Sequence, residues 1–279
     1  MAHPRSRARP GTSRRALLAP ALLLAALLTG CGGAAGDGGG DVDEAAADSV
    51  ETPELGACRV LTPEDVARPS DATEVVDCAE PHTAETFAVG DLPDELHDEA
   101  WDSPELGKFA YGTCGEAFQS FLGVDESRVM RSVVSWAWFR PSEQAWADGA
   151  RWYRCDAVGG GEASASYVEL PRTARGMLRG APEDRWTVCA DGETVAEADK
   201  VPCTEPHTWR AVTTIKVGEP ADAWPGERLV EVTSRDFCSS SVGAWLNYPL
   251  DYEFGWTAFG EGQWEAGNRR SICWARTDR

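Results

Sequence analysis

The chain has 279 residues, with 26 basic and 46 acidic side chains and a formal charge of −20 at pH 7. This balance argues against nucleic acid, anionic lipid surfaces and polyanionic wall polymers as direct partners, because like charges repel. Residues 1–31 hold five arginines and no acid, so the chain without them has 21 basic against 46 acidic side chains.

The first residues predict export and lipid anchoring. Arginines between positions 5 and 15 precede an apolar run over 16–28, which is too short for an ordinary membrane span and is typical of a signal peptide. The run ends in Leu28-Thr29-Gly30-Cys31, which resembles a bacterial lipobox. We expect cleavage before Cys31 and lipidation of its thiol, with acyl chains that hold the protein on the outer face of the cell membrane.

Two alternatives to this interpretation are a plain signal peptide with a chance cysteine and an uncleaved anchor helix. Ser13-Arg14-Arg15 also weakly resembles a twin-arginine signal. Sec export is favoured, and twin-arginine export stays open. Residues 32–55 are rich in Gly, Ala, Asp and Glu and have too few large apolar residues to form a core, so we expect a disordered acidic tether.

The rest of the chain contains an internal duplication. Eight cysteines remain beside Cys31, and they fall into two sets of four: Cys58, Cys78, Cys114, Cys155, and then Cys189, Cys203, Cys238, Cys273. The segment 78–83 (CAEPHT) recurs at 203–208 as CTEPHT. We therefore expect a signal peptide and lipobox at 1–31, the tether at 32–55, one module at 56–158, a linker at 159–183 and a second module at 184–279.

In the first module the residue pattern predicts strands at 86–89, 133–139 and 151–158, because these segments are rich in β-branched and aromatic residues. Phe118, Phe121 and Leu122 follow Cys114 at helical spacing, which predicts an amphipathic helix with this cysteine in its first turn. Pro141 is expected in the turn between the last two strands.

The second module repeats this order. Strands are predicted at 211–215, 251–259 and 269–275, and Val242, Trp245 and Leu246 follow Cys238 at the same helical offsets. Gly260 is expected in the last turn. The predicted fold class is α+β, with two tandem small disulfide-stapled modules, each an antiparallel sheet with one main helix.

An even number of cysteines in an exported chain predicts disulfides, at about 2–4 kcal/mol each. Four cysteines allow three pairings in each module. We favour first with second and third with fourth, because the segments 186–189 and 200–203 resemble two arms of a loop that a bridge closes. The favoured pairs are Cys58–Cys78, Cys114–Cys155, Cys189–Cys203 and Cys238–Cys273.

These features resemble the extracytoplasmic domain of the septum formation family. The residues that carry the resemblance are Cys78, Pro81, His82 and Glu85 in the first copy, Cys203, Pro206 and His207 in the second, and the later Trp, Gly, Arg and Cys of each copy. Arg210 stands where the second copy would have the acidic residue. The resemblance implies a link to division or envelope biology, and it implies no reaction.

The candidate functional residues are His82, His207, Glu85, Trp146, Trp264, Arg151 and Arg269. The two histidines are interpreted either as metal ligands or proton carriers, or as structural side chains whose ring nitrogen binds a backbone carbonyl beside the Pro turn. The structural interpretation is favoured, because a metal needs three or four ligands and the nearby cysteines are expected to be oxidised.

The aromatic pairs Trp138 with Trp146 and Trp256 with Trp264 are interpreted as core, with a ligand groove as the alternative. Arg151 and Arg269 either bind a carboxylate ligand or, as favoured, pair with an acid or stack on a Trp. His97 has no counterpart in the second copy and is interpreted as a surface residue, and the acidic runs 91–105 and 193–199 as solvated faces.

No serine-hydrolase, metalloprotease or phosphate-loop motif is present in the sequence. We therefore expect a non-enzymatic binding or scaffolding module of the cell envelope, without a cofactor, with the membrane and another envelope protein as partners. One alternative is an enzyme or metal-dependent factor that acts on envelope polymers at His82 or His207. Another is a small-ligand sensor that uses the Trp and Arg positions.

Overall fold

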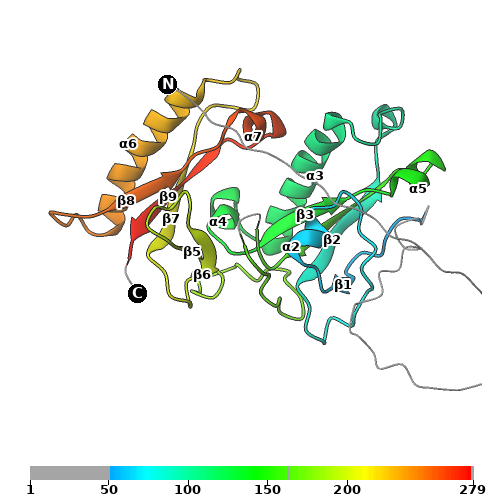
Figure 1. The fold of residues 1–279 in the computed structure, drawn as a ribbon, viewed down its shortest axis with the longest axis horizontal. Helices are drawn as coiled ribbons and strands as arrows, with labels where there is room; N and C mark the ends of the chain where they lie inside the picture. The colour runs from blue at the N-terminus through cyan, green and yellow to red at the C-terminus, as the bar shows by residue number, and fades with distance from the viewer. Residues whose placement is uncertain (1–50, 162–163, 278–279) are drawn as a thin grey trace, which may run out of the picture. The chain divides into compact units, whose positions relative to one another are not determined.

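The computed structural model describes residues 51–161 and 164–277. These residues form two antiparallel sheets with six α-helices and one short 3-10 helix, η1 (Asp94–Leu96) (Figure 1). Four disulfides join elements within the two modules. The α+β class predicted from the sequence is confirmed.

The first sheet has the strand order β1-β2-β4-β3. Its strands are β1 (Cys58–Arg59), β2 (Ala84–Asp91), β3 (Ser135–Phe139) and β4 (Trp152–Val158). The helices of this part are α2 (Pro63–Val66), α3 (Pro104–Leu122), α4 (Glu126–Met130) and α5 (Glu143–Ala147).

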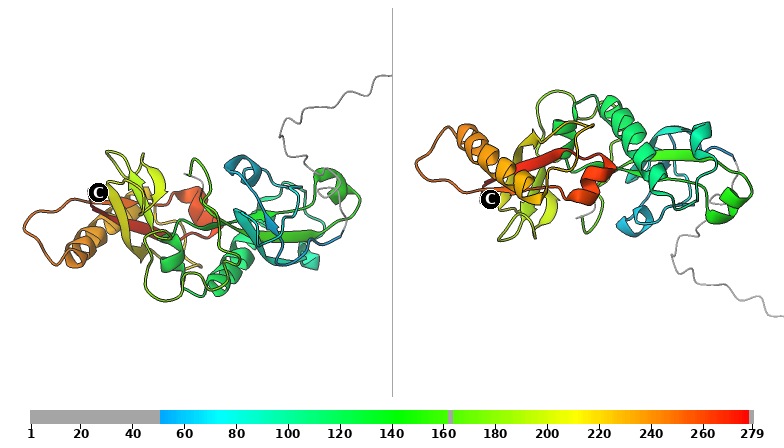
Figure 2. Two further views of the ribbon diagram at one scale, coloured as in Figure 1. Left: turned by 90° about the horizontal axis from the view of Figure 1, so that it is seen from below. Right: turned by 90° about the horizontal axis from the view of Figure 1, so that it is seen from above.

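The second sheet has the order β6-β5-β7-β9-β8. Its strands are β5 (Val188–Asp191), β6 (Asp199–Pro202), β7 (Trp209–Lys216), β8 (Phe254–Thr257) and β9 (Arg270–Arg276). The helices are α6 (Glu227–Trp245), which lies along one face of this sheet (Figure 2), and α7 (Glu261–Ala266).

The duplication extends to the register of the strands. Cys155 of β4 lies opposite Trp138 of β3, and Cys273 of β9 lies opposite Trp256 of β8. The β2–β4 pair changes register between Thr86 and Ala88, and the β7–β9 pair changes register between Ala211 and Thr213. Both irregularities begin eight residues after the second cysteine of their copy, so the two modules share one backbone plan.

The position of the main helix differs from the prediction that the cysteine lies in its first turn. Helix α3 begins at Pro104 after the N-cap Ser103, ten residues before Cys114, and α6 begins at Glu227, eleven residues before Cys238. The buried positions before the cysteines include Ala110 and Ser234, whose small side chains give a weak apolar periodicity. The prediction of a helix was confirmed, but the expected start was wrong.

The segments between the last two strands also differ from a simple turn. Ser142 caps the short helix α5, one residue after Pro141, and Gly260 is the N-cap of α7. Gly149 and Gly267 end these helices with φ of 100° and 112°, a conformation that favours glycine over residues with a Cβ. This requirement explains why both copies have glycine there.

The disulfides have the pairing favoured from the sequence. Cys114–Cys155 and Cys238–Cys273 each join the main helix to the central part of the sheet, with all four residues buried. Cys189–Cys203 closes the β5–β6 hairpin, the two arms expected from the sequence.

The segment expected as a linker, 159–183, contributes to the core. Leu170, Ala174 and Leu178 are at most 6% exposed and belong to a cluster that also contains Phe118 of the first module and Trp274 of the second. Because one apolar cluster contains residues from both copies, we expect residues 51–277 to unfold cooperatively.

Helix α4 adds polar contacts between the copies. Glu126 pairs with Arg270 at 2.6 Å, and Ser127 shares a 2.8 Å hydroxyl hydrogen bond with Thr214. Beyond the helix, Arg131 donates to the Val212 carbonyl at 3.1 Å. These contacts attach the end of the first helical region to strands of the second sheet.

No helix in the described residues is both long and apolar enough to cross a membrane. Cys31 and the expected signal peptide lie outside these residues, as does the tether up to residue 50.

Candidate functional site

The two motif histidines have the same buried arrangement. His82 is 1% exposed and His207 is 3% exposed. The Nδ1 atom of each ring lies 2.8 or 2.7 Å from the carbonyl oxygen of the residue two positions earlier, Glu80 or Glu205. Since a carbonyl only accepts, Nδ1 carries the proton and Nε2 is left as an acceptor. Each ring therefore fastens the turn before β2 or β7.

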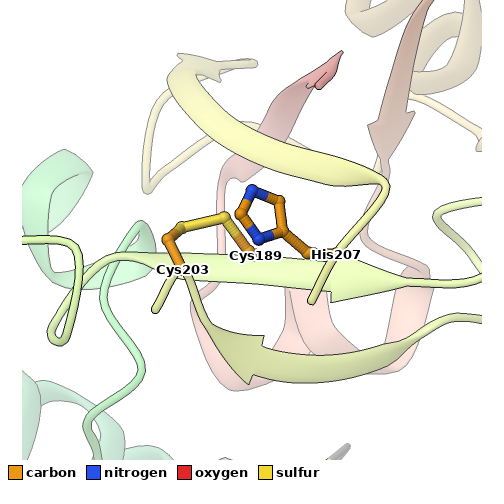
Figure 3. Close-up of side chains that lie close together, drawn as sticks. All are labelled: Cys189, Cys203 and His207. Atoms are coloured by element: carbon orange, nitrogen blue, oxygen red, sulfur yellow. A yellow bond between two sulfur atoms is a disulfide. The ribbon is translucent and has the colours of Figure 1, made fainter. Parts of the chain in front are cut away.

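Neither Nε2 atom has a hydrogen-bond partner among the described residues. Figure 3 shows the ring of His207 beside the disulfide between Cys189 and Cys203. The ligand atoms of these three residues lie within 4.8 Å of one another, the one such group found among the described residues. A bridged pair of sulfur atoms cannot serve as two thiolate ligands, so only one imidazole nitrogen remains for a metal ion.

Glu85 and Arg210 occupy the same position in the two copies and have similar tasks. Glu85 is 7% exposed, and its carboxylate accepts from the Thr173 hydroxyl at 2.9 Å and from the Ala174 amide at 2.6 Å. Arg210 donates to the Asp184 carboxylate at 2.8 Å. Glu85 thus holds the connecting segment 159–183, whereas Arg210, with the opposite charge, holds Asp184 at the start of the second module.

The Trp and Arg candidates form one stacked pair in each copy. The guanidinium of Arg151 lies 4.1 Å from the ring centre of Trp146, and that of Arg269 lies 3.6 Å from Trp264. Each arginine also donates to the carbonyl of its own Trp, which closes the short helix α5 or α7 onto the following strand. Trp146 and Trp264 are 7% and 4% exposed. Both arginines contact protein on several sides, as a structural cation–π pair does.

His97 has a fixed position that the sequence did not indicate. Its side chain is 40% exposed, and its Nε2 atom lies 2.8 Å from the Leu92 carbonyl. Its own carbonyl accepts from Arg151 at 2.9 Å. The side chain is therefore at the surface, and these two hydrogen bonds fix its position.

A buried charge network in the first module is another feature without a prediction from the sequence. Arg154 contacts Asp71 at 2.5 Å and Asp156 at 3.0 Å, and Asp156 accepts from Thr86 at 2.7 Å. Arg59 donates to the same Thr86 at 2.9 Å. The alternation of Arg154 and Asp156 around Cys155 was a usable sequence signal, because alternate residues of a strand face the same side.

A cleft lies along the free edge of the second sheet, with a volume of about 860 Å³. Strand β8 is the last strand of its sheet and pairs only with β9. Helix α6 provides one side of the cleft and residues 193–196 provide the other. The side chains that give it its character are aromatic and acidic: Trp209, Phe254, Trp256, Phe259, Glu193, Glu227, Glu231 and Glu253.

The 193–196 side of the cleft is held in place by Lys200. Its amine donates to the Val195 carbonyl at 2.7 Å and lies 4.6 Å from the Trp274 ring centre. Burial lowers the pKa of Lys200 from its ordinary value, and nearby Asp199 opposes this shift. Val195 is buried and packs beside Gly255, where an added Cβ would lie 2.9 Å from it. The acidic run at 193–199 is thus partly packed, with Glu193 at the cleft.

The corresponding groove of the first module is narrowed by helix α7 of the second module. There, α3 and β3 line a smaller space of about 370 Å³ together with residues of α7. Trp136 and Trp138 are the counterparts of Phe254 and Trp256, and Gly107 is the counterpart of Glu231. The sequence analysis named Trp138 and Trp256 but not Trp136 and Phe254, and it did not indicate which groove is wider.

A family model described as "Septum formation" matches residues 32–140 and 132–273. These matches cover most of the chain, so the protein belongs to the septum formation family, and two matched regions agree with two tandem copies. Comparisons with curated proteins and with solved structures found no match. The family links the protein to a role in cell division outside the cytoplasm.

Proposed function

We propose that the protein is a lipid-anchored binding or scaffolding module of the cell envelope, held at the outer face of the cell membrane through Cys31. The lipobox-like end of the apolar N-terminal run supports the anchor, and family membership supports a division-related role. The acidic tether then separates the folded modules from the lipid surface.

The open cleft beside β8 is the observation that carries the binding part of this proposal. It combines a sheet edge, four aromatic side chains and four glutamates at one surface. Phe254 and Trp256 are partly exposed there, whereas Trp209 and Phe259 are buried beneath them. Partly exposed aromatic residues in a concave site are typical of recognition surfaces.

The contacts of the motif residues support a structural rather than a chemical role for them. His82 and His207 are buried and bound to backbone carbonyls, while Arg151 and Arg269 stack on their tryptophans. An enzyme or metal factor centred on the histidines, or a ligand sensor centred on the Trp–Arg pairs, would need these groups to be accessible.

The anchor is tested by labelling cells with a palmitate analogue. The wild-type protein should incorporate the label and partition into detergent, and Cys31→Ser should be uncleaved or released without label. Unchanged labelling and partitioning of Cys31→Ser would contradict the anchor.

The binding role is tested by chemical cross-linking of the lipidated protein in its own cells, followed by purification. We expect recovery of a specific envelope protein, absent from a control with an unrelated anchored domain. Failure to recover any envelope protein at matched expression would contradict the binding role.

A further inference from the structure

We propose that the cleft beside β8 binds an extended basic peptide segment of an envelope protein, which adds to the free edge of β8 as a further strand. This inference rests on the proposed binding function and specifies its partner. The motif residues Cys203, Pro206 and His207 do not line this cleft.

The sheet edge favours an extended occupant. Strand β8 pairs with β9 through residues Phe254 to Thr257 and has no neighbour on its other side among the described residues. An edge strand presents unpaired backbone donors and acceptors, which an added strand satisfies. The cleft has walls on both faces of this edge, because α6 lies on one side and residues 193–196 on the other. Such walls confine a chain that runs along the strand.

The charge of the cleft favours a basic occupant. Within the described residues, the carboxylates of Glu193, Glu227 and Glu231 have no ion-pair or hydrogen-bond partner. Arg276 is the one basic residue that lines the cleft, and it pairs with Glu253 at 3.0 Å. Three uncompensated carboxylates beside half-buried aromatic rings suit Lys or Arg side chains, which form ion pairs and cation–π contacts.

Comparison with the first module strengthens this assignment. The positions of Glu227, Glu231 and Glu253 correspond to Ser103, Gly107 and Ser135, so the acidic side chains are particular to the second copy. In the first copy the groove is narrowed by α7 of the same chain, whose residues Gly262, Glu265 and Ala266 line it.

In the first copy, the groove between the main helix α3 and the edge strand β3 is therefore lined in part by α7, a segment of the other module. We assign to the groove of the other copy the same ability to take a segment from outside its own module. A second molecule of this acidic chain is a poor occupant for an acidic cleft, which favours a different, basic protein.

The test uses the purified mature protein in detergent and a short fluorescein-labelled peptide in which lysine alternates with threonine. We expect saturable binding by fluorescence anisotropy, weakened by added salt, and amide NMR shifts centred on residues 254–257. A peptide with glutamate in place of lysine should not bind. A lysine peptide with alternate backbone amides N-methylated should bind much more weakly, because it retains the charge but cannot pair as a strand.

The variant for this test is Glu227→Gln with Glu231→Gln, both on the exposed part of α6. We expect binding about tenfold weaker, the size of effect for two rim ion pairs. The control is Asp94→Asn with Glu95→Gln, which removes the same charge from an exposed 3-10 helix of the first module and should leave binding unchanged.

Equal weakening by both double variants, or equal binding of the N-methylated peptide, would reduce the interaction to general charge attraction and overturn the proposal. Self-association that the Glu227→Gln, Glu231→Gln variant abolishes would make a second copy the occupant and also overturn it. If that variant still recovers the wild-type envelope partner in cells, the binding function stands and this assignment of its site fails.

Discussion

The two modules share the contacts that stabilise their interiors. They differ at the groove beside the edge strand of each sheet. Both have the helix-to-sheet disulfide, the buried histidine and the arginine stacked on a tryptophan. The groove beside the edge strand is narrowed by α7 to about 370 Å³ in the first module, whereas in the second it is wider, about 860 Å³, and acidic. The contacts that the two copies share therefore stabilise the fold. The residues that differ lie where each copy contacts, or leaves open, a groove.

The opposite face of the sheet differs as well. Arg154 and Asp156 of the first module lie at the positions of Ile272 and Trp274 in the second. The first copy buries a charged network there, and the second uses its apolar residues in the cluster that both modules share. The first sheet thus buries a charged network, which includes Asp71, between apolar residues such as Trp152 and Val158, and the second sheet joins the central core.

Asp156→Ala tests this difference and should have the largest effect. The substitution leaves Arg154 buried with one carboxylate fewer, and we expect a loss of about 3–5 kcal/mol in the free energy of unfolding. Urea denaturation followed by circular dichroism measures it. Asp94→Asn, at a fully exposed side chain, is the control and should change stability very little. A loss below about 1 kcal/mol for Asp156→Ala would mean that the network is not a stabilising unit.

The position shared by Glu85 and Arg210 gives the next comparison. Glu85→Ala removes a buried carboxylate that accepts two hydrogen bonds from the connecting segment, so we expect a loss of about 2–3 kcal/mol. Arg210→Ala removes a pair whose Asp184 side chain is 44% exposed, and its cost should be at most about 1 kcal/mol. Equal losses in the two variants would contradict a stronger attachment at the first copy.

The stacked arginines should give a smaller effect that is the same in both copies. Arg151→Lys and Arg269→Lys keep the charge but lose the planar contact with Trp146 or Trp264, and we expect about 1 kcal/mol for each. Denaturation followed by tryptophan fluorescence measures both variants. A loss of peptide binding without a loss of stability would instead indicate a ligand-binding role for these arginines.

The sequence predicted the elements whose signals are local. The matched spacing of the two copies predicts three strands of each sheet and favours the disulfide pairing, but it does not predict β1, β5 or β6 as strands. The starts of α3 and α6 were missed because Ala110 and Ser234 are small core residues with little apolar signal. The residue pattern predicts a linker at 159–183, but Leu170 and Leu178 pack in the core, because burial there depends on tertiary contacts.

The candidate site could be predicted only in part. The repeat identifies Trp256, but Glu227 and Glu231 lie before the expected start of their helix, so the pattern does not indicate them. Whether a groove is open depends on the placement of α7 against the first module, and no residue pattern within either groove specifies that placement. Matched repeats therefore predict shared architecture better than they predict which surface is free.

The smallest expected effect on stability concerns Tyr111, at the groove of the first module that α7 narrows. A Cβ added to Gly267 would lie 2.5 Å from the ring of Tyr111. The counterpart of Tyr111 in the second copy is Arg235, an exposed residue that pairs with Asp236. Burial, and to a lesser extent the charge of Glu126, raises the pKa of Tyr111 from 10.0 to about 12.

Because the folded state holds this proton more tightly than the unfolded chain, the contribution to stability is fully present below pH 10. It is lost as the pH rises through about 12. Phenolate absorbance should show one tyrosine that titrates late, and Tyr111→Phe should remove this signal. The same variant should lose less stability than the wild type as the pH rises through this range. Titration of Tyr111 at the ordinary pKa of a tyrosine would mean that α7 leaves this ring open to water. The contrast between a groove that α7 covers and one that it does not cover would then be lost.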